Sequence, residues 1–312
     1  MKLGEVKARL YGMLNARQTG CRNWDRDALQ QAIEPTCLTI LALRHDWTKE
    51  LEMALRGIVA SQNSDGSFPV FIGDESEGCW TTGLAVLSLL AIGRETARLQ
   101  PAIRWILDAK GREANWFWRW KFQTIDRSVQ FDPAKYGWSW VPDTTSWVIP
   151  TAFNLIALRQ TNKRGLNTTP ELTERISIGS SMLLDRMCPG GGWNAGNAMA
   201  FGMPYAPYID ATAIALLALD ERQTQPGVRA SLAWLVPRLS RCPSPYSLAW
   251  GILALARYQD ISREVNEMLD RTSRELMSLL DSARGTDDIC TLAICALALD
   301  AVEGDNVFEV RR

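Results

Sequence analysis

Short, almost entirely apolar segments recur along the whole chain. They are rich in alanine and leucine, contain few β-branched residues, and close on an Ala-Leu-like pair followed by Arg, Asp or Gly. A segment with no polar face is a buried element, and its composition favours a helix over a strand. We therefore predict six buried inner helices, at residues 35–44, 81–93, 150–159, 210–220, 246–257 and 288–300.

The segments between them have one apolar and one charged face. Their apolar residues recur at i, i+3, i+4 and i+7, which is typical of half-exposed helices. These outer helices are expected at residues 49–62, 97–110, 171–187, 227–239 and 262–280, after an opening helix at 3–16. Inner helices enclosed by outer ones predict an all-α fold, an α/α toroid of about six helix pairs that forms a single domain over residues 1–312.

An open solenoid of stacked helix pairs is the alternative architecture, and it keeps a nearly constant repeat length. Here the ends of successive inner helices are between 36 residues (Leu219 to Leu255) and 66 residues (Ile92 to Leu158) apart. The uneven spacing favours the closed toroid.

A second regularity follows the outer helices. Gln62, Gly66 and Phe68 have the spacing Gln-x-x-x-Gly-x-aromatic, and weaker copies end at Trp116 and at Trp193. A glutamine here can cap one helix and bridge to the next, a glycine permits the turn, and an aromatic ring fills the gap between helix pairs. We expect Gln62, Phe68, Trp116 and Trp193 to be structural.

This pattern resembles the QW motif of the squalene-hopene and oxidosqualene cyclases, whose toroid is shared with protein prenyltransferase β subunits. The resemblance covers most of the chain and implies a hydrophobic central cavity for an isoprenoid or another hydrophobic ligand. For class II cyclases it also implies an aspartic acid of a DxDD motif that protonates an alkene. No DxDD motif is present, and its paired carboxylates survive only as Asp287-Asp288.

In an alternating barrel all inner helices run in one direction, so the residues that precede them meet at one rim. That rim includes Glu34, together with four candidate acids and several aromatic residues. The candidate catalytic acids are Asp143, Asp210, Asp287 and Asp288, and the candidate ligand contacts are Trp80, Trp138, Trp140, Trp147, Tyr205, Tyr208, Tyr246 and Trp250. The alternative for Asp143 and Asp210 is a structural role as helix N-caps.

An aromatic-rich insertion at about residues 114–147 departs from the repeats. It contains six tryptophans, three phenylalanines and one tyrosine, interleaved with basic residues. The insertion could plug the toroid, line a pocket, or fold across the cavity mouth as a lid that is partly an interface. It could also stack on sugars, as in (α/α)6 carbohydrate-active enzymes, with two rim carboxylates as acid and base.

Charge and cysteine content limit the partners. With 34 basic and 35 acidic residues and no basic cluster, nucleic-acid binding is disfavoured. Seven scattered cysteines without a Cys-x-x-Cys pair suggest a reducing, cytoplasmic location. The longest apolar stretch, 83–93, is too short to cross a bilayer, although a peripheral membrane contact stays open.

The sequence predicts no metal and no cofactor. Asp288 and Cys290 have the Asp-x-Cys spacing of the prenyltransferase zinc site, but the one histidine, His45, follows the first inner helix at the opposite end. A lone toroid would leave one apolar mouth uncovered, so a second helical domain or a homodimer is an expected partner. A non-catalytic binding or scaffold protein on the same fold remains the alternative to an enzyme of the cyclase or isomerase type.

Overall fold

A computed structural model describes residues 3–20, 31–94, 96–126, 130–282 and 288–309 of the 312-residue chain. These residues are mostly helical. The strands among them, β1 (Met199–Ala200) and β2 (Met203–Pro204), form one short antiparallel hairpin in which Met199 pairs with Pro204. None of the described helices combines the length and the hydrophobicity needed to cross a lipid bilayer.

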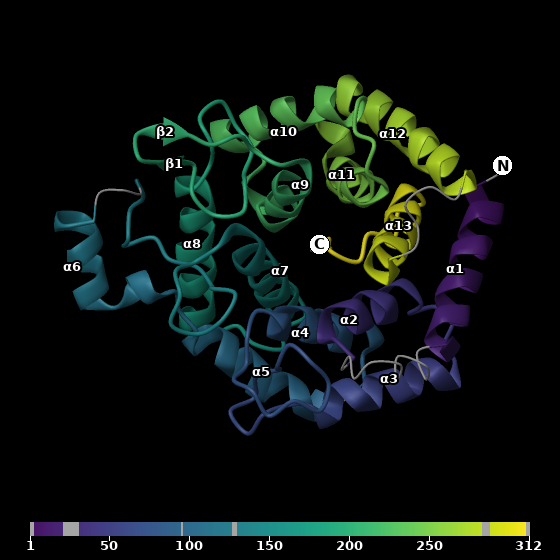
Figure 1. Ribbon diagram of the computed structural model, residues 1–312, viewed down its shortest axis with the longest axis horizontal. Coiled ribbons are helices and arrows are strands. Elements are labelled where there is room, and N and C mark those ends of the chain that lie inside the picture. The colour runs from purple at the N-terminus through teal and green to yellow at the C-terminus, as the bar shows by residue number, and fades with distance from the viewer. Residues whose placement is uncertain (1–2, 21–30, 95, 127–129, 283–287, 310–312) are drawn as a thin grey trace.

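Six helices of the described chain form a closed inner ring (Figure 1). Each contacts the next along the chain, and the last contacts the first, which confirms the toroid and excludes the open solenoid. The inner helices are α2 (Ile33–Ala42), α4 (Thr81–Ile92), α7 (Val148–Lys163), α9 (Ile209–Ala218), α11 (Pro245–Tyr258) and α13 (Ile289–Val302).

A second layer of helices surrounds this ring (Figure 1). The outer helices are α1 (Leu3–Gly20), α3 (Lys49–Ala60), α5 (Thr96–Asp108), α8 (Pro170–Asp185), α10 (Pro226–Leu239) and α12 (Arg263–Asp281). In α12, Val265, Leu269 and Leu276 are buried while the Arg263 side chain is 91% exposed, so one face packs on the ring and the other meets solvent. The predicted alternation of inner and outer helices is confirmed.

The inner helices are apolar on every side because every side is covered. All residues of α4 from Thr81 to Leu90 are buried, and α13 is buried from Thr291 to Ala301. Each fully buried leucine or isoleucine stabilises the fold by about 1.5–3 kcal/mol. Polar groups are thereby restricted mainly to the two ends of the ring.

The carboxyl ends of the inner helices meet at one end of the ring and carry arginines. Arg44, after α2, pairs with Asp300 of α13 at 3.2 Å, and Arg257 of α11 donates to Asp220 after α9 at 2.7 Å. Cations at helix carboxyl ends complement the helix dipoles. His45 lies at this end as expected, with Nε2 2.6 Å from a carboxylate oxygen of Asp305.

Residues 303–309 fold back over this same end of the ring, toward its centre (Figure 1). Asn306 donates to the Leu253 carbonyl at 2.9 Å, and Gln160 donates to the Val307 carbonyl at 2.8 Å. The buried Phe308 ring packs against Trp250 and Phe153, with ring centroids 5.2 Å and 6.2 Å apart. The chain therefore fills this part of the axis with its own aromatic side chains.

Gln62 joins two outer helices as predicted. Its amide nitrogen donates to the Gly66 carbonyl and to the Arg98 carbonyl of α5, both at 2.9 Å. Gly66 has φ +93°, and a Cβ there would lie 2.4 Å from the Pro101 backbone. Only glycine satisfies both the turn and the close approach.

The aromatic residues that lock the repeats share one hydrogen-bond pattern. The backbone N–H of Phe68, Trp138 and Trp193 each donates to a threonine hydroxyl in the first turns of the next inner helix, at 2.9–3.0 Å. Both tryptophans also donate from Nε1 to a carbonyl near the end of the preceding outer helix, Ile106 in α5 and Leu183 in α8. Trp138 is therefore the structural aromatic of its repeat.

The prediction for Trp116 was wrong. Trp116 begins α6 (Trp116–Thr124) and is 78% exposed, whereas Trp138 is 2% exposed. The physical reason is that an extra segment, with the 3-10 turn η2 (Arg112–Ala114) and α6, separates α5 from its aromatic lock. Two further 3-10 turns, η3 (Asp220–Arg222) and η4 (Gln259–Ile261), follow α9 and α11.

Buried charged side chains tie the base of this insertion to α8 and the residue after it. Arg175 donates to the carbonyls of Ala109 at 2.9 Å and Gly137 at 2.7 Å, the two points where the insertion leaves and rejoins the ring. The buried Glu113 carboxylate accepts from the Ser146 N–H and pairs with Arg186 at 3.4 Å. Breaking such a pair would leave an uncompensated buried charge.

Replacing Trp138 by alanine should destabilise the protein strongly, by about 3–5 kcal/mol, because it removes a buried ring that fills the space between repeats. Trp116→Ala is the matched control and should change stability by no more than about 0.5 kcal/mol. Urea unfolding followed by circular dichroism measures both. Similar losses for the two variants would contradict the assignment of Trp138 as the lock.

Candidate functional site

Acidic and phenolic side chains from four inner helices gather at the amino end of the ring. Glu34 lies in the first turn of α2, Asp210 in that of α9 and Tyr246 in that of α11, and Asp288 is the N-cap of α13. Asp288 accepts from the Thr291 N–H at 2.8 Å and from its hydroxyl at 2.9 Å. The six parallel helix amino ends favour negative charge at this rim.

Electrostatic interactions couple Glu34 to Asp288, and Tyr246 to Glu34 and Asp210. Burial raises the pKa of Glu34, and the nearby Asp288 carboxylate raises it further. Burial also raises the pKa of Tyr246, with Glu34 and Asp210 acting in the same direction and Trp250 opposing them. Burial raises the pKa of the Cys290 thiol to about 12, again supported by Glu34 and Asp288. We call Glu34, Asp210, Tyr246, Asp288 and Cys290 the acid cluster.

Two of the predicted acids lie at the amino ends of inner helices, and a third lies apart in a loop. Asp210 and Asp288 belong to the acid cluster, and Asp287 lies outside the described residues. Asp143 is exposed in the loop before α7, with φ +56°. The N-cap alternative was wrong for Asp143 and Asp210, because the caps of α7 and α9 are Trp147 and Tyr208 and neither helix has a side-chain cap.

Glu34 is the acid that sequence reasoning placed at the rim without assigning it a role. Its side chain is only partly exposed, and it follows the fully buried Ile33 on a helix that is buried from Cys37 to Ala42. The sequence signal for an acid here is a lone carboxyl on a mostly apolar inner helix, because burial disfavours its charged form.

The predicted aromatic contacts divide into groups. Tyr246 and the buried Trp250 adjoin the acid cluster, with ring centroids 6.3 Å apart. Trp80 and Trp140 form an edge-to-face pair at 4.9 Å. Trp138 is the structural lock, and Trp147 packs at Gly196, where a Cβ would lie 2.8 Å from its ring.

The two predicted tyrosines before α9 are exposed. Tyr205 follows the hairpin and is 51% exposed, and Tyr208 is 57% exposed at the start of α9. Their backbone N–H groups donate to the Ala198 and Trp193 carbonyls at 2.9 and 2.8 Å. The contact of either side chain with a ligand stays a prediction.

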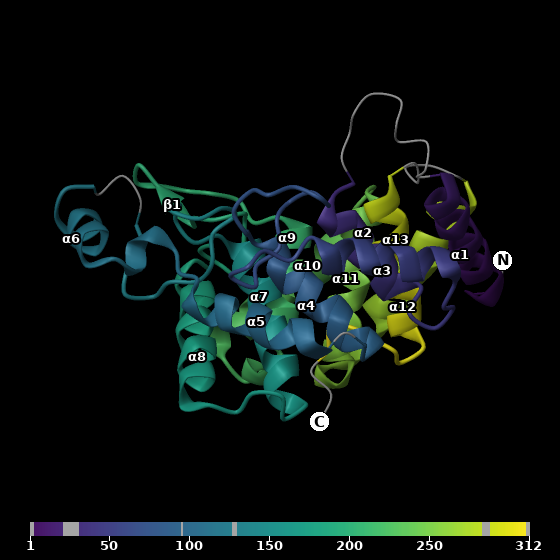
Figure 2. The same ribbon diagram turned by 90° about the horizontal axis from the view of Figure 1, so that it is seen from below.

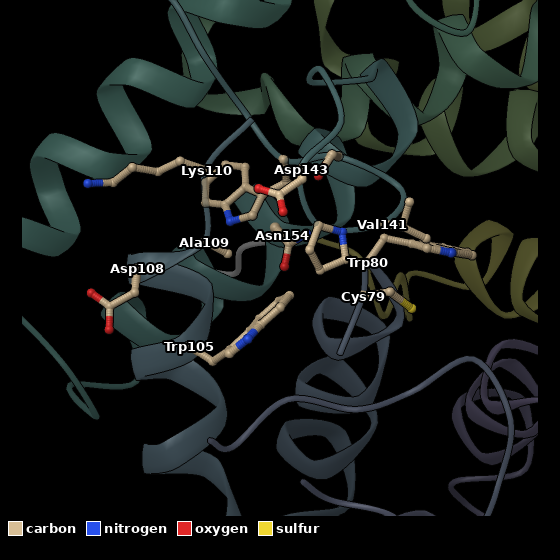
Figure 3. A pocket seen from close by; sticks show the side chains of 12 residues that line it. Cys79, Trp80, Trp105, Asp108, Ala109, Lys110, Val141, Asp143 and Asn154 are labelled. Carbon is tan, nitrogen blue, oxygen red and sulfur yellow. The ribbon is translucent and has the colours of Figure 1, made fainter. Parts of the chain in front are cut away.

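A lateral pocket of about 280 Å³ lies between helix pairs, beside the Trp80 ring (Figure 3). The carboxyl end of α5, the loop that contains Asp143, the residues before α4 and Asn154 of α7 form its walls. A second cavity of about 430 Å³ lies at the carboxyl end of the ring, and its walls include Arg44, Lys163 and Arg164.

The aromatic insertion does not cover the ring. Helix α6 extends away from the side of the toroid and contacts mainly the η2 turn, as both views show (Figures 1 and 2). Trp116, Phe117 and Trp120 on α6 are 78%, 46% and 49% exposed. The prediction of a lid across the mouth was therefore wrong. A second helical domain, a homodimer and a peripheral membrane contact stay predictions.

Within the residues that the structure describes, no three His, Cys, Asp or Glu side chains converge as a group that could hold a metal ion. Asp288 and Cys290, which have the prenyltransferase-like spacing, lie in the acid cluster at the amino end of α13. His45 lies at the carboxyl end of the ring, where Asp300 of α13 pairs with Arg44.

Comparison with known proteins supports the architecture. Neither models of known protein families nor curated sequences match the chain. The type II terpene cyclase MstE from Scytonema superposes with a TM-score of 0.54 at 15% identity, over 89% of this chain and 79% of that one. The ent-copalyl diphosphate synthase from Streptomyces platensis superposes with a TM-score of 0.56 at 16% identity.

This chain covers half of the length of the ent-copalyl diphosphate synthase, while 88% of its own residues take part in the superposition. Identities this low establish a shared architecture. The closed ring of inner helices and these two similarities together show that the chain has the α/α-toroid fold of class II terpene cyclases.

Proposed function

We propose that the protein binds an isoprenoid or a similar hydrophobic alkene at the amino end of the ring and that Glu34 protonates it. The observation that carries this proposal is the position of Glu34, a partly buried carboxyl in the first turn of an inner helix, where burial and the Asp288 carboxylate raise its pKa. A carboxyl group whose protonated form is favoured, beside a second carboxylate, is suited to proton donation. The fold similarity to terpene cyclases supports the ligand class.

The proposed chemistry begins with one proton transfer. Glu34 donates its carboxyl proton to the less substituted carbon of an alkene, and the π electron pair forms the new C–H bond. Positive charge develops on the more substituted carbon, and a second double bond of the same molecule can attack it to close a ring. Loss of a proton from the resulting cation gives the neutral product and restores the proton balance.

The surrounding groups support this step in different ways. The Asp288 carboxylate favours the protonated form of Glu34, and its own position is held by two hydrogen bonds to Thr291. The Tyr246 ring, partly buried in the first turn of α11, adjoins the acid cluster, and aromatic faces stabilise cations. In the ring, α11 with Tyr246 lies between α9 with Asp210 and α13. Asp210 would accept or relay a proton.

One observation favours a second candidate function, the non-catalytic binding of a small hydrophobic ligand on the same fold. Phe153, Trp250 and Phe308 stack on one another and fill part of the ring axis. A filled axis leaves less room for the folding of a long isoprenoid chain. The carbohydrate-active alternative has no comparable observation in its favour.

Replacing Glu34 by glutamine should abolish turnover of linear isoprenoids, with a rate at least about 100-fold lower, because general acid catalysis contributes about that much or more. Products are measured by gas chromatography with mass spectrometry. Glu171→Gln, an exposed residue in the first turn of α8, is the matched control and should leave the rate unchanged.

Undiminished turnover by Glu34→Gln would overturn the acid assignment. Mass spectrometry of lipids that copurify with the protein distinguishes the two candidate functions. A bound hydrophobic ligand without turnover of any tested isoprenoid would favour non-catalytic binding, and turnover would favour the enzyme.

The raised pKa of Glu34 also predicts a pH-dependent stability. Because the folded protein holds this proton more tightly than the unfolded chain, the associated stability is fully present below the ordinary pKa of 4.5 and is lost as the pH rises through the folded-state pKa. Glu34→Gln resembles the protonated form. It should match the wild type near pH 4 and exceed its urea midpoint at pH 7. A difference between the two proteins that does not vary with pH would refute this.

A further inference from the structure

The lateral pocket is separate from the acid cluster and has a different chemistry. Its volume is about 280 Å³, and indole rings of Trp80, Trp105 and Trp138 form part of its walls. None of the acid-cluster residues lines it. The ligand of this pocket can therefore be inferred independently of the proposed function.

A buried hydrogen-bond acceptor without a partner lies in the wall of this pocket. Asn154 is 0% exposed, and its Oδ1 makes no hydrogen bond to any described residue. The orientation of the amide is defined, because Nδ2 donates to the Pro150 carbonyl at 2.9 Å and a flipped amide would place two acceptors together. A buried acceptor left unpaired costs about 1–3 kcal/mol, so a ligand that brings a donor is favoured.

Three further features of the pocket favour a positive charge. Aromatic faces attract cations, and tryptophan does so most strongly. The pocket lies against Trp105, Asp108 and the residues that follow, at the carboxyl end of α5, where the helix dipole is negative. The third feature is the Asp143 carboxylate, held in a loop whose backbone has φ +56° at that residue.

One lining residue carries the same charge as such a ligand. Figure 3 shows the ammonium group of Lys110 directed away from the space between Trp80, Trp105 and Asn154. The Asp108 carboxylate also points away from that space in the same view. Lys110 therefore does not occupy the position that the indole rings and Asn154 define, and Asp108 offers a control for Asp143.

We propose that the lateral pocket binds a small alkylammonium ion, a protonated primary or secondary amine. Its N–H groups donate to Asn154 Oδ1 and to the Asp143 carboxylate. Its short alkyl chain packs against the Trp80 and Trp105 rings, which also stabilise the charge.

Titration calorimetry with three probes separates charge from hydrogen bonding. The n-butylammonium ion should bind to the wild-type protein. Butanol, which keeps a donor but has no charge, and tetramethylammonium, which keeps the charge but has no N–H donor, should each bind about tenfold or more weakly, since a hydrogen bond involving a charged group contributes about that factor. Equal binding of butanol or of tetramethylammonium would overturn the proposal.

Variants then locate the contacts. Asp143→Asn retains a residue type that tolerates the left-handed backbone and should weaken n-butylammonium binding about tenfold. Asp108→Asn removes the same charge from the edge of the pocket and should change the affinity by less than about twofold. Equal losses in the two variants would show a general charge effect and overturn the assignment of Asp143.

Asn154→Leu keeps nearly the same side-chain shape but removes the acceptor, and it should also weaken n-butylammonium binding about tenfold. Circular dichroism and the urea midpoint confirm that the variant is folded. If Asn154→Leu does not fold, Trp105→Leu, which removes a half-exposed indole, must show the loss of n-butylammonium binding instead. Unchanged affinity in a folded variant of either kind would overturn the proposal.

Discussion

The complete burial of the inner helices is the constraint on which the rest of the structure depends. A helix such as α4 or α13 that is covered on all sides cannot hold charged groups along its length. Charged groups are therefore concentrated at its two ends. Because the inner helices are parallel, their amino ends form one rim with Glu34, Asp210 and Asp288, and their carboxyl ends form the other with Arg44 and Arg257.

The two ends have different consequences. At the carboxyl end, Arg44 and Arg257 are paired with Asp300 and Asp220, and residues 303–309 cover the ring. At the amino end, burial and the nearby Asp288 carboxylate raise the pKa of Glu34. Desolvation and the neighbouring negative charge favour the protonated form of Glu34 at the amino end. At the carboxyl end, the arginines are held in salt bridges.

Much of the fold could be predicted from sequence because the hydrophobic periodicity reports burial directly. Every predicted inner and outer helix is present, and the bridge from Gln62 to the next outer helix follows from its position after α3. Trp116 was misassigned because local spacing alone cannot reveal an insertion. The threonine in the first turns of each following inner helix, Thr82, Thr151 and Thr212, identifies the locking aromatic more reliably than the spacing does.

The site was less predictable. Sequence order placed Asp210, Asp288 and Glu34 at one rim, but only the three-dimensional arrangement distinguishes the half-buried Glu34 from the capping Asp288. Asp143 belongs to a pocket formed by the end of α5 and by Asn154, residues with no common sequence pattern. Such a pocket depends on how the insertion rejoins the ring, which periodicity does not encode.

The most direct test of the central claim is the titration of Glu34 itself by carbon-13 NMR of its side-chain carboxyl. The account predicts a pKa above the ordinary value of 4.5 that decreases when Asp288 is replaced by asparagine. A Glu34 carboxyl that titrates at or below 4.5, or whose pKa is the same in the Asp288→Asn variant, would contradict it.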